Sequence, residues 1–434
     1  SKTVEREPNS TPEKIEHPVE QAVEKRSNTP YWARRAGSTG TDQSYDLAID
    51  ANDNIYIIGV FQGTTRFGGT TLTSSWSHTP ESFVAKLDPH GNWLWAKHIK
   101  NEQKQGNESY ITVDAKGNIL LAGAFRYNAT FGRFALKGRG LADLFIAKLS
   151  ASGKWLWAKG TGSESLDWIT AVTTDTKGNI YTAGFVQGAT TFGSTTITTP
   201  SETLFVAKLS TDGEWLWART ADSPRSSSRI THLALGKQND LVVTGQFGGA
   251  ITFGKDTLRQ TGLRFSDMFV AKLTTQGKWL WGRRGEYATG QAVAVHPQGG
   301  ICVAGIFYAK SDFGKTTLST DPSADSDSIF VAMLDAKGKW LWAQQTVKEI
   351  SSMLGSDLDG AAFDQQGHCT ISGTMSHEQK FGTQKLGKYY GRSLAFVAKL
   401  DKQGKWLWAR STGLEYRSST GEGMVLDSKG NIVV

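Results

Sequence analysis

A Gly-x-Trp-Leu-Trp segment recurs about every 60 residues and constrains the fold of this chain more than any other feature. The first tryptophan of each copy is Trp93, Trp155, Trp215, Trp279, Trp340 and Trp406. Each copy follows a Phe-(Val/Ile)-Ala-x-Leu segment and, further upstream, a Phe-Gly pair and an apolar stretch that ends in glycine. These elements keep the same order in six copies, so we predict a repeat protein whose units share one structure.

Each repeat unit has the pattern of four short strands. In the second unit, the candidate strands are Tyr110–Asp114, Ile119–Phe125, Leu144–Leu149 and Trp155–Lys159, and glycine-containing turns separate the first two and the last two. No helical periodicity of 3.6 residues is present, which argues against a solenoid of helices. Four strands per unit at this period are typical of a β-propeller blade. We expect the first strand to line the axis and the Trp-Leu-Trp strand to lie outside.

The prediction is therefore an all-β fold, a seven-bladed β-propeller of four-stranded antiparallel blades that covers residues 31–434. The polar segment 1–29 is expected to be a tail or linker. The blades are expected at about 45–99, 108–160, 168–219, 229–285, 290–345 and 353–411, with the seventh formed by 421–434 together with 31–36.

The seventh blade is expected to be closed by strands from both termini. Tyr31–Arg34 matches the Trp-Ala-Arg end of the motif at Leu407–Arg410, so it would supply the outer strand. Residues 423–434 would supply the first strand and the start of the second. Closing the ring in this way removes the exposed edge of an open sheet. The third strand of this blade is absent, so we expect that the chain continues past Val434.

The repeated string Gly-Asn-Ile-x-x-x-Gly, Phe-Gly-x-x-x-Leu, Phe-Val-Ala-Lys-Leu-Asp-x-x-Gly-x-Trp-Leu-Trp-Ala resembles the bacterial SBBP-type seven-bladed β-propeller repeats. It is almost complete at 117–158 and 178–218, and the likeness covers about 31–434. Met333 stands where the string usually has lysine. The family consists mainly of secreted or surface-exposed bacterial proteins, often from Bacteroidota, without a shared activity. The resemblance therefore implies an extracellular or outer-membrane location, with the periplasm as the other possibility.

The strand pattern predicts where two cysteines and one lysine lie in their sheets. Cys302 and Cys369 lie in the second strands of the fifth and sixth units, and their places in these strands put them on opposite sheet faces. Across the interface between two blades they could meet or diverge. Because packed sheets lie about 10 Å apart, we expect two small buried residues rather than a disulfide. Lys148, in a third strand, is expected to extend its amine toward the rim.

No catalytic, metal or cofactor site is recognisable. The eight histidines have neither the mutual spacing nor the cysteine neighbours of a zinc site. No Gly-x-Ser-x-Gly segment is present. The aspartates that recur at the ends of first strands are interpreted as turn residues. The net charge of +7 is not accompanied by a basic cluster, so we expect no nucleic-acid partner. No apolar run is long enough to span a membrane as a helix.

These observations favour a non-enzymatic binding or scaffold protein, one component of a larger assembly in the bacterial cell envelope. Features that break the repeat are the best contact candidates, because loops on rigid scaffolds carry function. They are Trp76, Tyr389, Tyr390 and Arg392 in loops, and Val19 and Val23 in the tail, which could tether the protein to its partner. A lectin-like propeller that binds glycans is the first alternative. A lyase or hydrolase with its site at the channel mouth is the second.

Overall fold

The computed structural model describes residues 32–434 apart from 76–78, 102–108, 222–226, 237–238, 263–264, 321–326, 349–355, 376–377, 388–392 and 412–422. The chain divides into two compact units, Ser1–Arg34 and Arg35–Val434. In the described part of the second unit, every regular element is a β-strand. Each is treated by itself below.

Six repeat units in the described residues each form a four-stranded antiparallel sheet, in which the strands are neighbours in the order in which they follow along the chain. The sheets are β1 (Gln43–Ile49), β2 (Ile55–Phe61), β5 (Glu81–Leu87) and β6 (Trp93–Asn101); β7 (Ser109–Val113), β8 (Ile119–Phe125), β11 (Asp143–Leu149) and β12 (Trp155–Thr161); β13 (Trp168–Thr174), β14 (Ile180–Phe192), β15 (Thr195–Leu209) and β16 (Trp215–Arg219); β17 (Ser228–Gly236), β18 (Asp240–Phe247), β21 (Asp267–Thr274) and β22 (Trp279–Gly285); β23 (Ala288–Val295), β24 (Ile301–Tyr308), β27 (Asp327–Leu334) and β28 (Trp340–Gln345); and β30 (Asp357–Phe363), β31 (Cys369–Met375), β34 (Leu394–Leu400) and β35 (Trp406–Ser411).

A small hairpin connects the second and third strands of each unit. The hairpins are β3 (Thr64–Phe67) and β4 (Thr70–Thr73), β9 (Asn128–Phe131) and β10 (Phe134–Lys137), β19 (Ala250–Phe253) and β20 (Asp256–Arg259), β25 (Lys310–Phe313) and β26 (Thr316–Ser319), and β32 (Gln379–Phe381) and β33 (Gln384–Leu386). In the third unit the hairpin is continuous with β14 and β15. Two hairpins pair with the preceding unit, β9 with β6 and β32 with β29 (Val347–Lys348).

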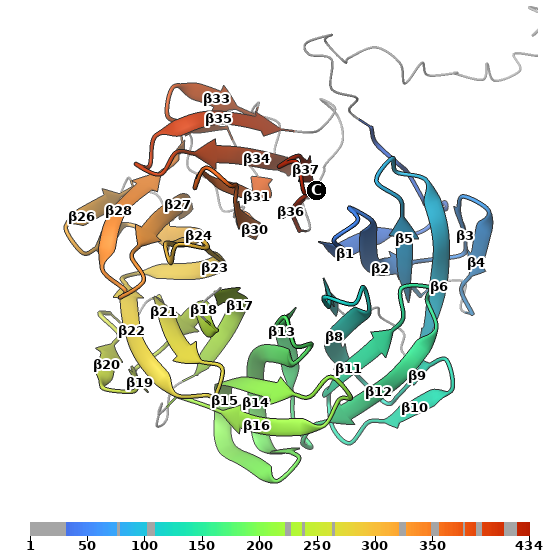
Figure 1. Cartoon of the computed structure of the whole chain (residues 1–434). Helices are drawn as coiled ribbons and strands as arrows, with labels where there is room; N and C mark the ends of the chain where they lie inside the picture. Colours follow the sequence, from blue (N-terminus) through green and yellow to red (C-terminus); the bar gives the residue numbers. More distant parts are fainter. Residues whose placement is uncertain are drawn as a thin grey trace, which may run out of the picture. The chain divides into compact units, whose positions relative to one another are not determined.

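The sheets surround a common axis (Figure 1). Among the four strands of each sheet, the first is innermost and the Trp-Leu-Trp strand is outermost, and hairpins such as β3–β4 and β9–β10 lie farther out still. Consecutive first strands contact one another, from β1 and β7 through to β23 and β30. The short strand β36 (Val425–Leu426) contacts both β30 and β1, and it pairs with β37 (Ile432–Val433). Residues 35–434 therefore form a ring that is closed along its innermost strands.

The two tryptophans of each motif pack in different directions. The first stands edge-on against the phenylalanine of the Phe-Gly pair in its own hairpin, with ring centroids 4.8–5.3 Å apart in all six units. The second lies on the glycine turn of the next unit, as Trp95 does on Gly153 and Trp281 on Gly338. The motif thus holds the hairpin to its own sheet and each sheet to its successor.

The prediction of an all-β propeller-type fold built from four-stranded antiparallel sheets is confirmed. The count of seven blades stays a prediction, because the sheet of β36 and β37 has two strands in the described residues. The outer strand predicted at 31–36 is not formed in its described part, since residues 32–36 carry no strand. An outer strand pairs with a third strand, and the described residues of this sheet contain none.

The prediction that Cys302 and Cys369 stay unpaired is wrong. They form a disulfide that joins β24 of the fifth unit to β31 of the sixth, and both side chains are fully buried. Their Cα atoms are 6.8 Å apart, at the upper end of the range of about 4.4–6.8 Å that disulfides span. The average spacing of packed sheets, about 10 Å, therefore does not apply to this pair of residues.

Candidate functional site

The connections at one end of the sheets are similar in all units, and those at the other end differ from unit to unit. Connections from first to second and from third to fourth strands lie at one end, called here the turn face. The other end, the loop face, carries the connections to the hairpins and between units. On the turn face, the recurrent aspartate accepts hydrogen bonds from backbone N–H groups two and four residues later, as Asp114 does from Lys116 and Asn118, both at 2.9 Å. The interpretation of these aspartates as turn residues is confirmed.

The turn-face aspartates also bind buried lysines. Lys148 is 3% exposed, and its Nζ lies 2.9 Å from Oδ2 of Asp114. The prediction that this lysine extends toward the rim is therefore wrong. It fails because the alternation of side chains along a strand predicts only the sheet face on which Lys148 lies. It does not predict that a carboxylate on the first strand is close enough to bind the amine. Burial raises the pKa of Asp114, but hydrogen bonds from Asn118 and Lys148 outweigh it and hold the pKa below its ordinary value.

The fifth unit lacks both members of this ion pair. His296 stands at the place of the aspartate, and Met333, 5% exposed, stands at the place of the lysine. The charges of the turn face are thus present as pairs in other units and absent together here. Such pairs give the buried lysines of this face a structural role.

On the loop face, buried carboxylates hold the connecting segments in place. Asp167, which is fully buried, accepts hydrogen bonds from the backbone and hydroxyl of Ser163 at 2.6 and 2.9 Å and from Thr190 Oγ1 at 2.8 Å. Asp267, also fully buried, binds Thr261 and the backbone N–H of Tyr287. Burial raises the pKa of Asp167. These bonds fix loops that differ in sequence from unit to unit, which is the arrangement of a rigid binding surface.

Two ionisable residues on first strands join neighbouring units. Asp46 accepts the backbone N–H groups of Leu47 and of Ile111 in the next unit, at 2.8 and 2.9 Å, and burial raises its pKa to about 7. His232 accepts the N–H of Val293 in the same way, and burial lowers its pKa to about 4. Both perturbed groups are explained by contacts between strands, so neither indicates a catalytic role.

One loop-face segment exposes an aromatic side chain. Tyr127 is 69% exposed and has a φ of 58°. Its neighbours Arg126, Arg139 and Leu141 are also exposed, and Leu141 is 66% exposed. The N–H of Gly138 donates to the carbonyl oxygen of Tyr127, which brings the two segments together. We call Arg126, Tyr127, Arg139 and Leu141 the Tyr127 patch.

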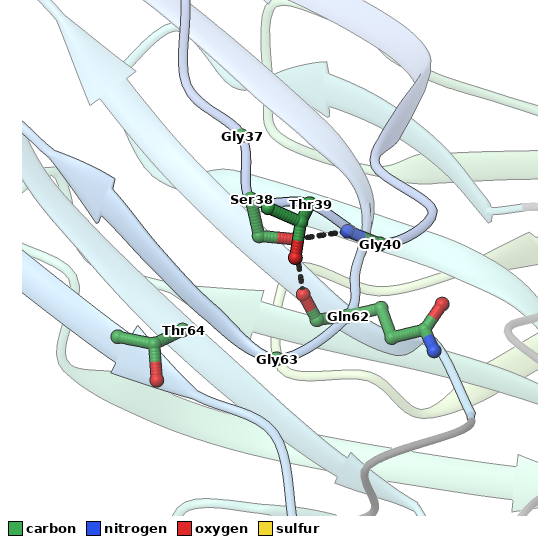
Figure 2. A pocket seen from close by; sticks show the side chains of 7 residues that line it. All are labelled: Gly37, Ser38, Thr39, Gly40, Gln62, Gly63 and Thr64. Atoms are coloured by element: carbon green, nitrogen blue, oxygen red, sulfur yellow. Dashed lines mark hydrogen bonds between the residues drawn. The ribbon is translucent and has the colours of Figure 1, made fainter. Parts of the chain in front are cut away.

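A second loop-face feature is a polar hollow of about 620 Å³ in the first unit. It is lined by Gly37, Ser38, Thr39, Gly40, Gln62, Gly63 and Thr64. Figure 2 shows that Ser38 organises it: the hydroxyl donates to the carbonyl oxygen of Gln62 and accepts from the N–H of Gly40. Asp42 Oδ2 accepts the backbone N–H of Ser38 at 2.6 Å. The lining offers backbone groups, hydroxyls and the side-chain amide of Gln62, and no ionisable side chain.

The contact residues predicted from the sequence lie outside the described residues, so they stay predictions; they are Trp76, Tyr389, Tyr390, Arg392, Val19 and Val23.

The sequence reasoning missed the Tyr127 patch. A signal for it exists at the position four residues after the glycine that ends the second strand. Three other units have Gly63, Gly188 and Gly249 there and the fifth has the small Ala309, whereas this unit has Tyr127. Among the described residues, no group of three or more potential ligands gathers in a way that could hold a metal ion. Nor do they form a helix able to cross a membrane.

Comparison with known proteins supports a repeat β-propeller. No protein-family model matches the chain. An uncharacterised WD repeat-containing protein of Acanthamoeba polyphaga mimivirus is 21% identical in an alignment 480 residues long. The alignment covers 87% of this chain. The chain spans about a third (34%) of the length of that relative.

Solved structures with a related arrangement are distant. A polysaccharide lyase of family PL25, an ulvan lyase, aligns over 90% of this chain and 97% of its own with 10% identity and a TM-score of 0.46. A protein of unknown function from Dyadobacter fermentans aligns over 86% and 95% with 11% identity and a TM-score of 0.44. Virginiamycin B lyase from Staphylococcus aureus aligns over 90% of both chains with 9% identity and a TM-score of 0.40. Likeness at this level carries no argument about activity.

Proposed function

We propose that the chain is a non-enzymatic binding scaffold that recognises a protein partner through the Tyr127 patch on its loop face. A propeller fold and a WD-repeat relative are consistent with a scaffold. The fixed loops of this face are suited to presenting contact residues without a large loss of entropy on binding.

The observation that carries the proposal is the backbone of Tyr127. At the equivalent position, Gly63, Gly188 and Gly249 have φ values of 76°, 87° and 69°, and the small Ala309 of the fifth unit has 55°. Glycine adopts this conformation without strain, whereas another residue held there costs about 1–3 kcal/mol. An exposed tyrosine makes few contacts that could offset such a cost within the chain. A strained, exposed aromatic side chain is therefore better explained by a contact with a partner.

The chemistry of the patch defines the partner further. Tyrosine and arginine are enriched at protein interfaces, and tyrosine supplies a large contact area with little side-chain entropy to lose. The exposed residues of the patch include two arginines, Arg126 and Arg139, and the apolar Leu141. We expect a partner surface that carries carboxylates around an apolar contact.

We further propose that the protein acts outside the cytoplasm, on the surface of a bacterial cell or secreted from it, as part of an envelope assembly. The buried disulfide between Cys302 and Cys369 supports this, because disulfides persist in oxidising compartments and are rare in the cytosol. The resemblance to SBBP-type repeats points the same way. The polar N-terminal segment, with Val19 and Val23, is proposed as a tether to the assembly.

Site-specific photo-crosslinking tests the binding role. A benzophenone side chain replaces Tyr127 in the full chain, and a second variant carries it at the exposed Lys116 on the turn face. We expect a discrete protein adduct from position 127 in cells that produce the protein, and none from position 116. Equal adducts from both positions, or none from 127, would contradict the proposal.

A substitution separates binding from folding. Tyr127→Gly should leave the free energy of unfolding unchanged or raise it by up to about 1 kcal/mol, since glycine relieves the strain but gains entropy in the unfolded chain. The same variant should lose the association found by crosslinking. A loss of stability would show that Tyr127 serves the fold. If a glycan array binds the wild-type chain and not the variant, the partner is a glycan instead of a protein.

A further inference from the structure

Two positions of the repeat set the charge on the outside of each seam, the contact between two consecutive units. One is the residue before the first tryptophan of the motif, and the other is the second residue after the second tryptophan. Between the second and third units these positions hold Glu214 and Lys159, whose Oε1 and Nζ atoms lie 2.8 Å apart. Side chains at the two positions therefore reach each other across a seam, and here their charges are paired.

Two other seams carry basic residues at both positions. Between the first and second units they are Lys97 and Lys154, and between the third and fourth they are Arg219 and Lys278. The first member of each pair lies on the glycine just before the second: Lys97 Cε and Arg219 Cγ are 3.2 and 2.9 Å from the place that a Cβ atom on that glycine would take. All four side chains are exposed, and none of them has an ion pair within the described part of the chain.

The turns at these two seams also lack acidic residues. The turn before the motif reads Ser-Ala-Ser-Gly at 150–153 and Thr-Thr-Gln-Gly at 274–277. In the other units this turn contains an aspartate; these residues are Asp88, Asp212, Asp335 and Asp401. Between the fourth and fifth units both positions are basic as well, Arg283 and Lys339, but Asp256 lies 2.9 Å from Arg283. The basic pairs without a nearby carboxylate therefore create a positive potential that attracts anions.

At the seam between the third and fourth units, a hollow of about 420 Å³ lies on the turn face beside the basic pair. We call it the Lys208 hollow; its lining includes Lys177, Lys208, Asn239, Gln276 and Leu280. Lys278 stands in the chain between the last two, and Leu280 is 38% exposed. The lining also contains two carboxylates. Asp240 lies 2.5 Å from Lys272, and Asp175 accepts hydrogen bonds from the backbone of its own turn.

Lys208 has unused hydrogen-bond donors. At the equivalent position of the second unit, Lys148 donates to the backbone and hydroxyl oxygens of Thr211 in the next unit. In the third unit, the hydroxyl of Tyr181 donates to Asp175 Oδ2 at 3.0 Å instead, and Lys208 Nζ lies over the Tyr181 ring, 5.1 Å from its centroid. The structure gives this ammonium group no hydrogen bond to any residue it describes.

The surroundings of Lys208 favour an anion in the hollow. Burial lowers the pKa of Lys208, the carboxylate of Asp175 offsets part of this effect, and repulsion by Lys177 adds to it. The other basic seam lacks such a lysine, because Lys86 of the first unit is buried and lies 3.8 Å from Asp50. Two lysines inside the hollow and a basic pair beside it thus distinguish the seam between the third and fourth units.

We propose that the Lys208 hollow, together with Arg219 and Lys278, binds an acidic polysaccharide. One carboxylate or sulfate group of the polysaccharide binds in the hollow to Lys177 and Lys208. A second acidic group farther along the chain binds to Arg219 and Lys278. The sugar rings between them lie against the exposed side chain of Leu280, and the polar groups of the lining bind sugar hydroxyls.

The apolar surroundings favour a polysaccharide over a nucleic acid. Sites for single-stranded nucleic acids combine basic grooves with aromatic rings on which bases stack. Here the ring of Trp217 lies on Gly277, and the guanidinium of Arg219 lies 5.8 Å from its centroid. Trp279 stands edge-on against Phe253 in its own hairpin. The exposed apolar contact at this seam is therefore the aliphatic Leu280, which suits the C–H faces of sugar rings.

Calorimetric titration of the full chain tests the ligand class. Polygalacturonate supplies carboxylates, dextran sulfate supplies sulfates, and neutral dextran of matched length is the control. We expect at least one anionic chain to bind, with an affinity that falls as the salt concentration rises, and neutral dextran not to bind. The anionic chain that binds identifies the acidic group. No binding by either anionic chain, or equal binding by neutral dextran, would overturn the proposal.

Single substitutions locate the site. Lys208→Met and Lys278→Gln should each weaken binding by about tenfold, since each removes a charged hydrogen-bond donor. The fifth unit carries Met333 at the position of Lys208, and Lys278 is exposed, so both variants should fold. Lys159→Gln removes the same charge at the seam where Glu214 pairs with it, and it should change the affinity by less than about twofold. Equal weakening by all three substitutions would indicate general charge attraction and would overturn the proposal.

Two further probes test the other possible occupants. They are single-stranded DNA and vesicles that contain phosphatidylglycerol. If either binds at least as tightly as the polysaccharides and is weakened by the same substitutions, the occupant is a nucleic acid or a membrane and the proposal is wrong. The Tyr127 patch takes no part in this site, so Tyr127→Gly should leave polysaccharide binding unchanged. Failure of the polysaccharide to bind would therefore leave the proposed function standing.

Discussion

Lys148→Met is the substitution that most directly tests how charge is buried on the turn face. Lys148 Nζ donates to Asp114 Oδ2 at 2.9 Å and to the backbone and hydroxyl oxygens of Thr211 in the next unit, at 3.2 and 3.1 Å. Methionine has nearly the same volume, so the change removes the charge and its hydrogen bonds with little loss of packing. The fifth unit already carries a methionine at this position, Met333, which is buried.

The loss of unfolding free energy in Lys148→Met depends on which interactions of Asp114 are removed and which remain. Two unit charges 2.9 Å apart attract by about 6 kcal/mol at an effective dielectric constant of 20, and desolvation of both groups opposes this. Removing one member of a buried pair typically costs about 3–5 kcal/mol. Asp114 keeps hydrogen bonds from Lys116 and Asn118, which places the cost at the lower end, about 3 kcal/mol. In Asp114→Asn/Lys148→Met no charge is stranded, so we expect a loss of only about 1–2 kcal/mol.

Urea unfolding of wild type, both single variants and the double variant at pH 7 gives the coupling energy of the pair. The folded state lowers the pKa of Asp114, so this group stabilises the protein above its ordinary pKa of about 3.9 and loses that contribution as the pH falls below it. The difference between wild type and Lys148→Met should therefore shrink below about pH 4. A single-variant loss under about 0.5 kcal/mol, or strict additivity in the cycle, would refute the reasoning.

Two further predictions concern contacts between units. Trp281 is 7% exposed and lies on Gly338, so Trp281→Ala should lower the free energy of unfolding by about 3–5 kcal/mol, whereas Leu280→Ala, at a site 38% exposed, should cost less than about 1; equal losses in urea unfolding would contradict the packing. Cys302 and Cys369 close a loop of 67 residues, so replacing both with serine should cost about 4 kcal/mol. Alkylation of the denatured, unreduced protein should label neither cysteine, and a labelled thiol would disprove the disulfide.

The sequence was sufficient to predict the fold because the same pattern of strands and turns recurs in every repeat. The alternation in Phe-Val-Ala-x-Leu and the glycine turns predicted the strands, and the Trp-Leu-Trp segment predicted the outer position of strands such as β12. The recurrent aspartates were also interpreted correctly. These predictions depend on neighbours within a few residues, which a repeat sequence displays directly.

What the sequence reasoning missed depends on residues that are far apart in the chain. The partner of Lys148 is 34 residues away, at Asp114, although the joint absence of both in the fifth unit was a readable clue. The approach of Cys302 to Cys369 depends on the local distance between two sheets, which no average spacing provides. In the sequence, Tyr127 differs only in standing where three other units have glycine. Its backbone φ angle was needed to interpret that difference.

The contact between the second tryptophan of one unit and the glycine turn of the next is directional. Trp95 lies on Gly153 and Trp281 on Gly338, so every unit presents one surface forward and a different one backward. Head-to-tail contacts of this kind produce a ring when the rotation per unit closes and an open filament when it does not. The number of units is therefore set by the angle between successive sheets, and each interface would remain intact if a repeat were gained or lost. Change in unit number is thus limited by geometric closure and not by the chemistry of the contacts.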